Sequence, residues 1–347
     1  MILLTNLKNS DKFICFLFSI LPISLIVGSA VLNIIIILID FYFIIEIFYK
    51  KQNKFLFNKI FFIFIFIWSL LLLNSIFIAS TFESLTRSFG FLRFILLIFA
   101  FKYYFEKKDD NFKKLIFGVW FLIFIIVTID IYIEFFSGTN ILGFKALYPG
   151  RIASFTGDEL KIGNYYFGFI LLSLSFIYFN YHKYNKYLFY IAALIFMLTS
   201  FIIGERSNFF KVFLIVTVFI FLVNKQNYLK KISILILFSI LSTSIIFSNE
   251  SFKSRFLDEI FVPLKEKGIS KFIENTKHGL HFEIAKNIFE ENKIFGVGIK
   301  NFRNVSKNIK YHSARTMEQG NTSHPHQIHF EFLSETGLVG YIVFIIF

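Results

Sequence analysis

The sequence has few cysteines, which cross-link small secreted proteins, and few prolines and glycines, which are common in disordered proteins. Its 347 residues include one cysteine, four prolines and 17 glycines. The single Cys15 lies in an apolar stretch, which excludes a disulfide framework and any multi-cysteine metal site. No segment has the composition of a disordered or low-complexity linker. No small-residue cleavage site follows the first apolar run, so we interpret this run as a retained span.

Apolar side chains dominate what is present. The chain is 56% hydrophobic, with 54 phenylalanines and a mean hydropathy of +0.66. Soluble domains of this length do not carry so many apolar residues. A spanning helix needs about 20 of them, and apolar runs fall near 13–29, 31–48, 60–79, 88–105, 115–136, 164–180, 188–204, 207–223, 232–248 and 331–347. The sequence therefore predicts an all-α polytopic membrane protein with about ten transmembrane helices and a large helical loop on the outer side.

Positive charges indicate an orientation. If the N-terminus is cytoplasmic, the loops near 50–59, 102–114, 181–187 and 224–231 are inside and lysine-rich, whereas the short outer loops are not. This pattern satisfies the positive-inside rule, and it accounts for the net charge of +13 without a nucleic-acid partner.

The same topology predicts three parts of the chain. We expect a bundle of nine spans over 1–248 with an outer loop at 137–163, a large outer loop over 249–330, and a final span over 331–347. The sequence stops inside that last apolar run, so we expect further spans in a longer protein.

Every arginine falls on the outer side or in the outer part of a span in this topology. The seven are Arg87, Arg93, Arg151, Arg206, Arg255, Arg303 and Arg315. A guanidinium fork binds phosphate bidentately, keeps its charge and is less hydrated than an ammonium group. Arg206 opens the eighth span, where a helix N-terminus favours an anionic ligand. Ordinary ion pairs with Glu83, Asp130, Glu134 or Glu205 are the structural alternative.

Three histidines crowd the end of the large outer loop, in "HPHQIH" at 324–329. His324, His326 and His329 suit metal binding or proton transfer, and a solvated loop without chemistry is the third interpretation. The segment is not a His-Glu-x-x-His helix, and the nearest carboxylates, Glu331 and Glu335, lie beyond it. We therefore expect no metal site.

The loop also contains an amphipathic segment at 281–292. Ile284, Ala285, Ile288 and Phe289 share one face, which predicts a helix on the membrane surface or packed over the bundle. The turn "GVGIKNFR" at 296–303 follows. Without a preceding strand, this Gly-x-Gly does not indicate a dinucleotide site.

These features fit three classes of function. A transferase acting on a lipid diphosphate needs cations for the leaving group and a base for the attacking hydroxyl, which arginine and histidine supply. A transporter or flippase for a lipid-linked saccharide would carry internal repeats, and none is clear. A periplasm-facing zinc hydrolase would use the histidines as ligands. The transferase fits best.

Four segments together resemble the O-antigen ligase and O-antigen polymerase superfamily of bacterial membrane proteins. They are "GRIASFTGDELKIGNYY", "GERSNFF", "KIFGVGIKNFR" and "HPHQIHFEFLSETGLVGY", and the resemblance covers about 90–347. It implies a C-type glycosyltransferase-like fold in the bacterial inner membrane, with a periplasmic, metal-independent active site and no cofactor. The implied donor is a glycan on undecaprenyl diphosphate. The acceptor is lipid A–core for a ligase and a lipid-linked repeat unit for a polymerase.

The resemblance also implies roles for individual residues. His326 would be the base, with His324 beside it, and Arg206 would clamp the diphosphate. A second cation would come from Arg255, His278 or Arg303, and further substrate-binding candidates are Arg151 and Arg93. Two positions depart from the family pattern. Gln327 stands where Asn is usual, and His278 or His281 lies near where many members have Arg.

Overall fold

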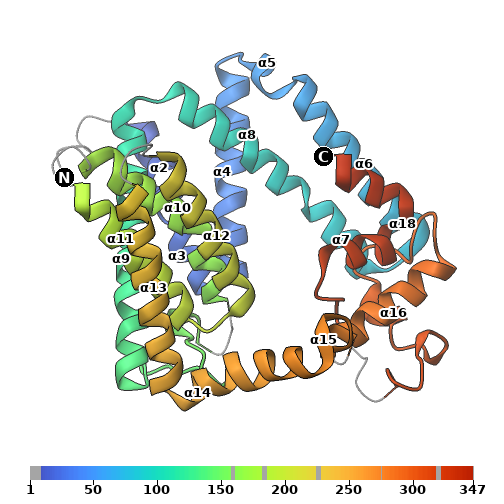
Figure 1. Ribbon diagram of the computed structural model, residues 1–347. Helices are drawn as coiled ribbons and strands as arrows, with labels where there is room; N and C mark the ends of the chain where they lie inside the picture. Colours follow the sequence, from blue (N-terminus) through green and yellow to red (C-terminus); the bar gives the residue numbers. More distant parts are fainter. Residues whose placement is uncertain are drawn as a thin grey trace. The chain divides into compact units, whose positions relative to one another are not determined.

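The computed structural model describes residues 9–157, 161–181, 186–223, 228–274, 276–317 and 322–346. Every regular element in these ranges is helical (Figure 1). Eight of their helices are long and apolar enough to cross a membrane: Ser29–Tyr49, Lys59–Ala79, Phe82–Lys107, Asp110–Ser137, Ile162–Tyr181, Arg206–Val223, Tyr228–Ser248 and Ile328–Ile346. The predicted fold class, an all-helical polytopic membrane protein, is confirmed. The expected count of about ten spans is not.

Two of the expected spans are absent from these eight. The run near 13–29 forms two short helices, α2 (Asn9–Ser19) and α3 (Leu21–Val27). Pro22 stands in the first turn of α3, and because proline lacks a backbone N–H, it cannot extend the hydrogen-bond ladder of a preceding helix. The run near 188–204 forms α11 (Lys186–Ile202), which at 17 residues is shorter than the eight.

Contacts divide the chain into two compact units, which we describe separately. The first contains Met1–Ile39 and Tyr104–Phe261, and the second contains Asp40–Tyr103 and Val262–Phe347. The three-part division expected from the sequence, with boundaries at 248 and 330, stays a prediction.

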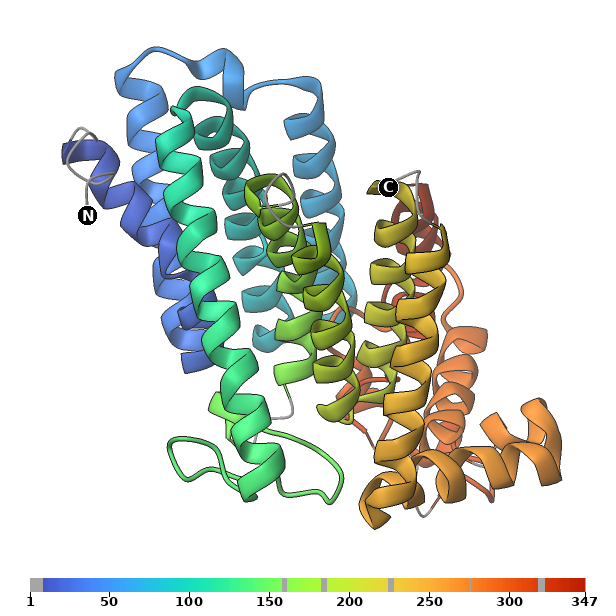
Figure 2. The ribbon, with the colours of Figure 1, turned by 60° about the vertical axis from the view of Figure 1, so that its left-hand side comes forward.

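The first unit is built around five neighbouring helices. They are α9 (Asp110–Ser137), α10 (Ile162–Tyr181), α11, α12 (Arg206–Val223) and α13 (Tyr228–Ser248), which lie side by side (Figure 2). Aromatic rings fill the space among them: the centroid of Phe124 lies 4.5 Å from that of Tyr166 and 5.0 Å from that of Phe196. Close packing of this kind holds helices together in a bilayer, where the hydrophobic effect between helices is absent.

Two buried carboxylates near the end of α9 hold the loop that follows it. Asp130 accepts a hydrogen bond from the Ser154 hydroxyl at 2.6 Å. Glu134 accepts from the backbone N–H groups of Ala153 at 3.1 Å and Ser154 at 2.6 Å. Buried charges need such partners. The interhelical ion pairs that we considered for these two acids are therefore replaced by bonds to the loop.

The second unit combines membrane helices with the helices of the large loop. The first group comprises α4 (Ser29–Tyr49, which begins in the first unit), α5 (Asn53–Leu56), α6 (Lys59–Asn74), η1 (Ser75–Ala79), α7 (Phe82–Gly90) and α8 (Leu92–Lys107, which ends in the first unit). The second comprises α15 (Val262–Glu274), α16 (Lys277–Glu291), α17 (Phe302–Val305) and η4 (Ile309–Tyr311), and the membrane helix α18 (Ile328–Ile346) that follows them belongs to the first group. Two short helices precede α15 in the chain, α14 (Glu250–Lys253) and η3 (Ser254–Phe261), and both belong to the first unit.

Helix α16 confirms the amphipathic segment. Ile284, Ala285 and Ile288 are buried in a small core, and α16 packs on α18. The helix begins four residues before the predicted segment, because the side chain of Thr276 caps it by accepting a hydrogen bond from the N–H of Gly279 at 3.1 Å.

The Gly-Val-Gly segment is a structural joint between α16 and α18. The N–H of Val297 donates to the Ser334 carbonyl at 2.9 Å, and that of Gly298 donates to the Glu335 carbonyl at 2.8 Å. Gly296 has φ +67°, and a Cβ there would lie 2.4 Å from the Glu335 carbonyl carbon. Helix α18 is kinked at Gly337, with φ 62° and ψ −162°. Only glycine fits this combination of backbone angle and contact.

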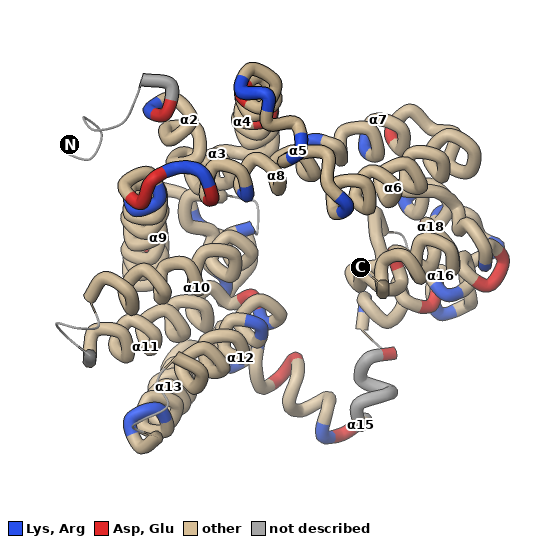
Figure 3. Tube along the Cα trace, turned by 90° about the horizontal axis from the view of Figure 1, so that it is seen from above, with Lys and Arg blue, Asp and Glu red and all other residues tan. Residues whose placement is uncertain are grey.

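Basic residues gather at the ends of helices. Figure 3 shows them around the connection between α8 and α9 and at one end of α13. This is the distribution on which the positive-inside argument depends. The cytoplasmic N-terminus stays a prediction.

Candidate functional site

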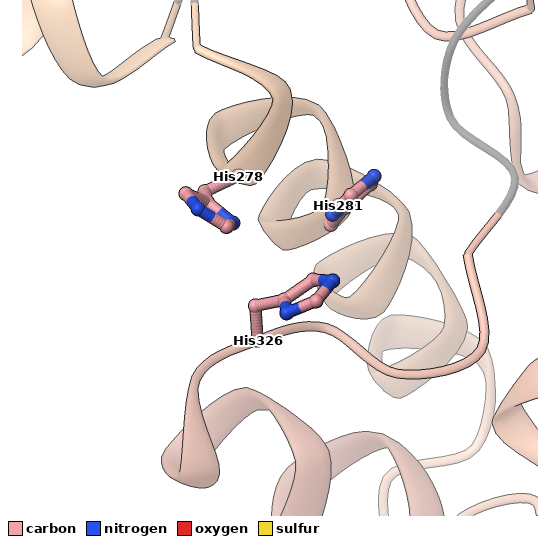
Figure 4. Close-up of side chains that lie close together, drawn as sticks. All are labelled: His278, His281 and His326. Carbon is pink, nitrogen blue, oxygen red and sulfur yellow. The ribbon is translucent and has the colours of Figure 1, made fainter. Parts of the chain in front are cut away.

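Three histidine rings face one another in the second unit (Figure 4). His278 and His281 project from the first turns of α16, where a spacing of three residues puts them on one side of the helix. His326 comes from the segment before α18. Its ring centroid lies 5.0 Å from that of His278 and 5.3 Å from that of His281. One ring nitrogen from each residue lies within 4.8 Å of the others.

The backbone at His326 is strained. Its φ is +61°, in the left-handed region that a non-glycine residue rarely adopts. On the C-terminal side, the Gln327 side chain accepts a hydrogen bond from the N–H of Phe330 at 2.8 Å, which caps the start of α18. Pro325, the residue before His326, is buried. Strain of this kind persists where the surrounding structure fixes it, and it concentrates at functional sites.

Burial and mutual repulsion lower the pKa of two of the clustered imidazoles, His281 and His326. Burial, followed by the charges of His324, His278 and His281, lowers the pKa of His326 to about 4. The pKa of His281 is lowered by burial and then by His278, His324 and Lys277. At neutral pH, His326 is therefore a neutral imidazole with one unprotonated ring nitrogen, and its Nε2 lies 3.4 Å from the Thr322 hydroxyl oxygen. An anionic substrate beside the ring would raise its pKa, because an opposite charge favours the imidazolium form.

The buried member of the cluster is His281. Its side chain is only 7% exposed, and among the described residues its Nδ1 has no hydrogen-bond partner. Buried polar atoms are normally satisfied, so an unpaired ring nitrogen here needs an explanation. The sequence analysis gave His281 no role, although its three-residue spacing from His278 on an amphipathic helix was available as a signal.

The structure separates His329 from the other two histidines of the "HPHQIH" segment. The ring centroid of His324 lies 4.0 Å from that of His326, and its Nδ1 pairs with the Ser323 hydroxyl at 2.9 Å. His329 instead pairs with the Tyr341 hydroxyl at 3.2 Å, on α18. The cluster is thus formed by α16 and the segment before α18, and not by one short segment.

A group of arginines lies in the first unit. Arg206, at the start of α12, donates to the Arg255 carbonyl at 3.0 Å and pairs with Glu259 at 3.0 Å. Arg255 is buried and donates to the Gly204 carbonyl at 2.8 Å. Its pKa is lowered by burial and then by the nearby charges of Arg151 and Arg206. Gathered guanidinium groups of this kind are suited to an anionic ligand.

Two glycines let the arginine-bearing segments approach each other. The N–H of Ile152 donates to the Ile203 carbonyl at 3.1 Å. Gly204 has φ +75°, and a Cβ there would lie 2.0 Å from the carbonyl oxygen of Gly150. This contact joins the outer loop that carries Arg151 to the N-terminus of α12.

Arg303 and Arg93 have different surroundings in the second unit. Arg303 forms an ion pair with Glu83 at 2.8 Å, and both side chains are partly exposed. Arg93 donates to the Gly90 carbonyl at 2.8 Å, and its guanidinium lies 4.6 Å from the centre of the Phe94 ring. The expectation that the arginines of both units act on one substrate stays a prediction.

Arg93 also lines a pocket of about 270 Å³. Arg87, Lys300, Glu331 and Glu335 contribute the other charged groups. An apolar pocket of about 300 Å³ is lined in part by the same two residues, Leu71 and Thr336. The sequence analysis did not assign Arg87 or Lys300 to a site, because their proximity depends on packing between α7 and the Gly-Val-Gly segment.

Comparison with known proteins gives one match. Residues 191–345 match a family model described as O-antigen ligase. The match contains the histidine cluster, Arg206, Arg255 and Arg303, and it begins after Arg93 and Arg151. No curated protein and no solved structure matches the chain. The domain indicates glycan transfer in lipopolysaccharide biosynthesis by a multi-pass membrane protein. Over residues 191–345, this match supports the resemblance of the chain to the O-antigen ligase and polymerase superfamily.

Proposed function

We propose that this protein transfers a glycan from an undecaprenyl-diphosphate carrier to a hydroxyl acceptor at the periplasmic face of the bacterial inner membrane. The acceptor is lipid A–core if the protein is a ligase and a lipid-linked repeat unit if it is a polymerase. The observation that carries the proposal is the placement of His326. It is a neutral imidazole in a strained conformation, within the matched O-antigen ligase domain.

The reaction assigns one task to the histidine and another to the arginines. The acceptor hydroxyl attacks the anomeric carbon of the donor, and the bond from that carbon to the diphosphate oxygen breaks. His326 takes the hydroxyl proton, and the electron pair leaves with the diphosphate. A positioned base and preorganised cations each lower the barrier of such a step. His324, whose ring lies against that of His326, helps to orient it.

The arginine group of the first unit provides the cations for the diphosphate. Arg206 is the principal clamp, and Arg255 and Arg151 add charge close to it. The backbone contacts of Arg206 and Arg255 fix both guanidinium groups before a ligand arrives. Arg303 contributes only if the ligand displaces Glu83 from its ion pair, and His278 contributes from the histidine cluster.

The pocket lined by Arg93 supports its predicted role in substrate binding. Arg87 and Arg93, together with Lys300, which pairs with Glu331 at 4.0 Å, lie beside an apolar pocket. An amphiphile with an anionic head and a hydrocarbon chain needs cations next to an apolar pocket. Lipid-linked donors and lipid acceptors share this chemistry.

The test is complementation of a strain that lacks the gene, with surface polysaccharide separated on gels. Wild-type protein is expected to restore long chains, and His326→Ala is expected to fail. His329→Ala, whose ring pairs with Tyr341 outside the cluster, is the matched control and is expected to complement. Core without any chains, together with accumulated lipid-linked polymer, identifies a ligase, and core with one repeat unit identifies a polymerase. An unchanged polysaccharide profile in the strain without the gene contradicts the proposal.

A further inference from the structure

We propose that His278, His281 and His326 bind one divalent transition-metal ion of the zinc class, and that its binding inhibits glycan transfer. The metal site depends only on the geometry of the three histidines. The inhibition depends on the proposed function, because it follows from the role of His326 as base.

The geometry of the cluster is close to that of a three-histidine site. Zinc binds imidazole nitrogens at about 2.0–2.1 Å in tetrahedral geometry, which places bound nitrogens about 3.4 Å apart. The ring nitrogens here lie within 4.8 Å of one another. Rotation of two side chains closes this gap, and two of the three, His278 and His326, are exposed. The rotation of His326 exchanges its contact of 3.4 Å with the Thr322 hydroxyl for the metal.

The third ligand is already in place. His281 is buried, so its ring is held by packing, and its Nδ1 lacks a hydrogen-bond partner among the described residues. A metal ion that enters the cluster meets one fixed imidazole and two adjustable ones. Three protein ligands leave a fourth position open to water or to an oxygen of a substrate.

The chemistry of the ligands selects the ion. Imidazole suits Zn²⁺, Cu²⁺, Ni²⁺ and Co²⁺, whereas Mg²⁺ and Ca²⁺ prefer oxygen ligands. Lys277 and the positive end of α16 lie next to His278, and they oppose a cation electrostatically. Coordination by imidazole nitrogens outweighs this electrostatic repulsion for a transition-metal ion. It does not outweigh the repulsion for a hard cation such as Mg²⁺ or Ca²⁺, which binds imidazole weakly.

Metal binding and proton transfer compete for the lone pair of the same ring nitrogen of His326. A ring nitrogen that donates its lone pair to the metal cannot accept a proton from the acceptor hydroxyl. Occupancy of the site therefore withdraws the base, and removal of the metal restores it.

The experiment measures metal binding and transfer separately, on the full-length chain purified in detergent and stripped of metal. Co²⁺ is the first probe, because tetrahedral coordination gives intense visible absorption bands. We expect one Co²⁺ per chain, displaced by Zn²⁺ and not by Mg²⁺. His281→Ala and His278→Ala are each expected to weaken binding by at least about tenfold. His278 is exposed, so its replacement tests the site even if the buried variant folds poorly. His329→Ala is the matched control and is expected to bind as the wild type does.

Absence of stoichiometric Co²⁺ binding overturns the metal site, and so does binding that survives both replacements. Transfer is then measured with and without Zn²⁺, and each variant is compared with its own metal-free rate. Inhibition that disappears in His278→Ala and persists in His329→Ala supports the proposal. Metal binding without inhibition overturns the regulatory part. A wild-type protein that binds metal but transfers no glycan under any condition contradicts the proposed function and leaves the metal site supported.

Discussion

His281 and His326 lie with their ring centroids 5.3 Å apart and their ring planes inclined by 28°, although one belongs to α16 and the other precedes α18. The joint made by the Gly-Val-Gly segment and the kink of α18 at Gly337 supports this arrangement. It packs the end of α16 against α18, and the histidines stand at the other end of α16.

Gly296→Ala tests this joint. We expect a loss of about 2 kcal/mol or more in stability, for two reasons. The backbone at Gly296 is left-handed, which disfavours alanine, and the added Cβ would lie 2.4 Å from the Glu335 carbonyl carbon. Gly143→Ala separates the two effects, since Gly143 also has a positive φ of +83° but no atom lies within 4 Å of its added Cβ. The control is expected to cost about 1 kcal/mol. Thermal unfolding in detergent measures both, and equal losses would contradict the account.

Arg206→Lys tests whether the guanidinium fork matters beyond its charge. We expect transfer to fall by about tenfold or more, because lysine cannot keep both the bond to the Arg255 carbonyl and a bidentate contact with a diphosphate. Arg315→Lys is the control, since Arg315 belongs to the second unit and pairs with Glu283 on α16. Initial rates with a lipid-diphosphate donor measure both variants. Full activity in Arg206→Lys would reduce the role of Arg206 to a simple positive charge.

Arg315→Gln tests the ion pair between Arg315 and Glu283, which lies on α16 close to His281 in the sequence. Burial tends to raise the pKa of Glu283, but hydrogen bonds from Ser313 and Arg315 and the charge of Arg315 outweigh it, so the pKa is lowered from its ordinary value of 4.5. A depressed carboxyl pKa contributes stability above pH 4.5 that is lost as the pH falls through the folded value. We expect a loss of about 0.5–1 kcal/mol at pH 7, the range of partly exposed pairs, and a smaller loss near pH 3.

Thermal unfolding at both pH values measures the difference between wild type and Arg315→Gln. Lys286→Gln removes an exposed pair with Glu290, 3.6 Å long, and is expected to have little effect at either pH. A loss in Arg315→Gln that stays constant with pH would show that packing, and not the ion pair, accounts for it.

Much of the fold follows from hydropathy alone. Long apolar runs with lysine-rich connections predict the membrane helices, and the apolar face of 281–292 predicts α16. The short helices α2 and α3 were not predicted, because a run of apolar residues does not show where a helix is interrupted.

The candidate site was predicted only in part. His326, His278 and the outer arginines have chemistry and position that mark them in the sequence. His281 was missed because its three-residue spacing from His278 places the two on one side of α16 but does not show that His326, a distant residue in the sequence, lies beside them. The partners of Asp130 and Glu134 were also missed, since backbone N–H donors on a loop leave no residue signature. Each of these depends on contacts between distant segments.

The central claim is that His326 accepts the proton from the acceptor hydroxyl during glycan transfer. Its most direct test is the initial rate of transfer by purified, metal-free protein from an undecaprenyl-diphosphate-linked glycan, for wild type, His326→Ala and His329→Ala. The account predicts that His326→Ala loses at least about 100-fold in rate, the usual contribution of a positioned general base, with His329→Ala close to wild type. A His326→Ala protein that is folded and transfers glycan at the wild-type rate would contradict it.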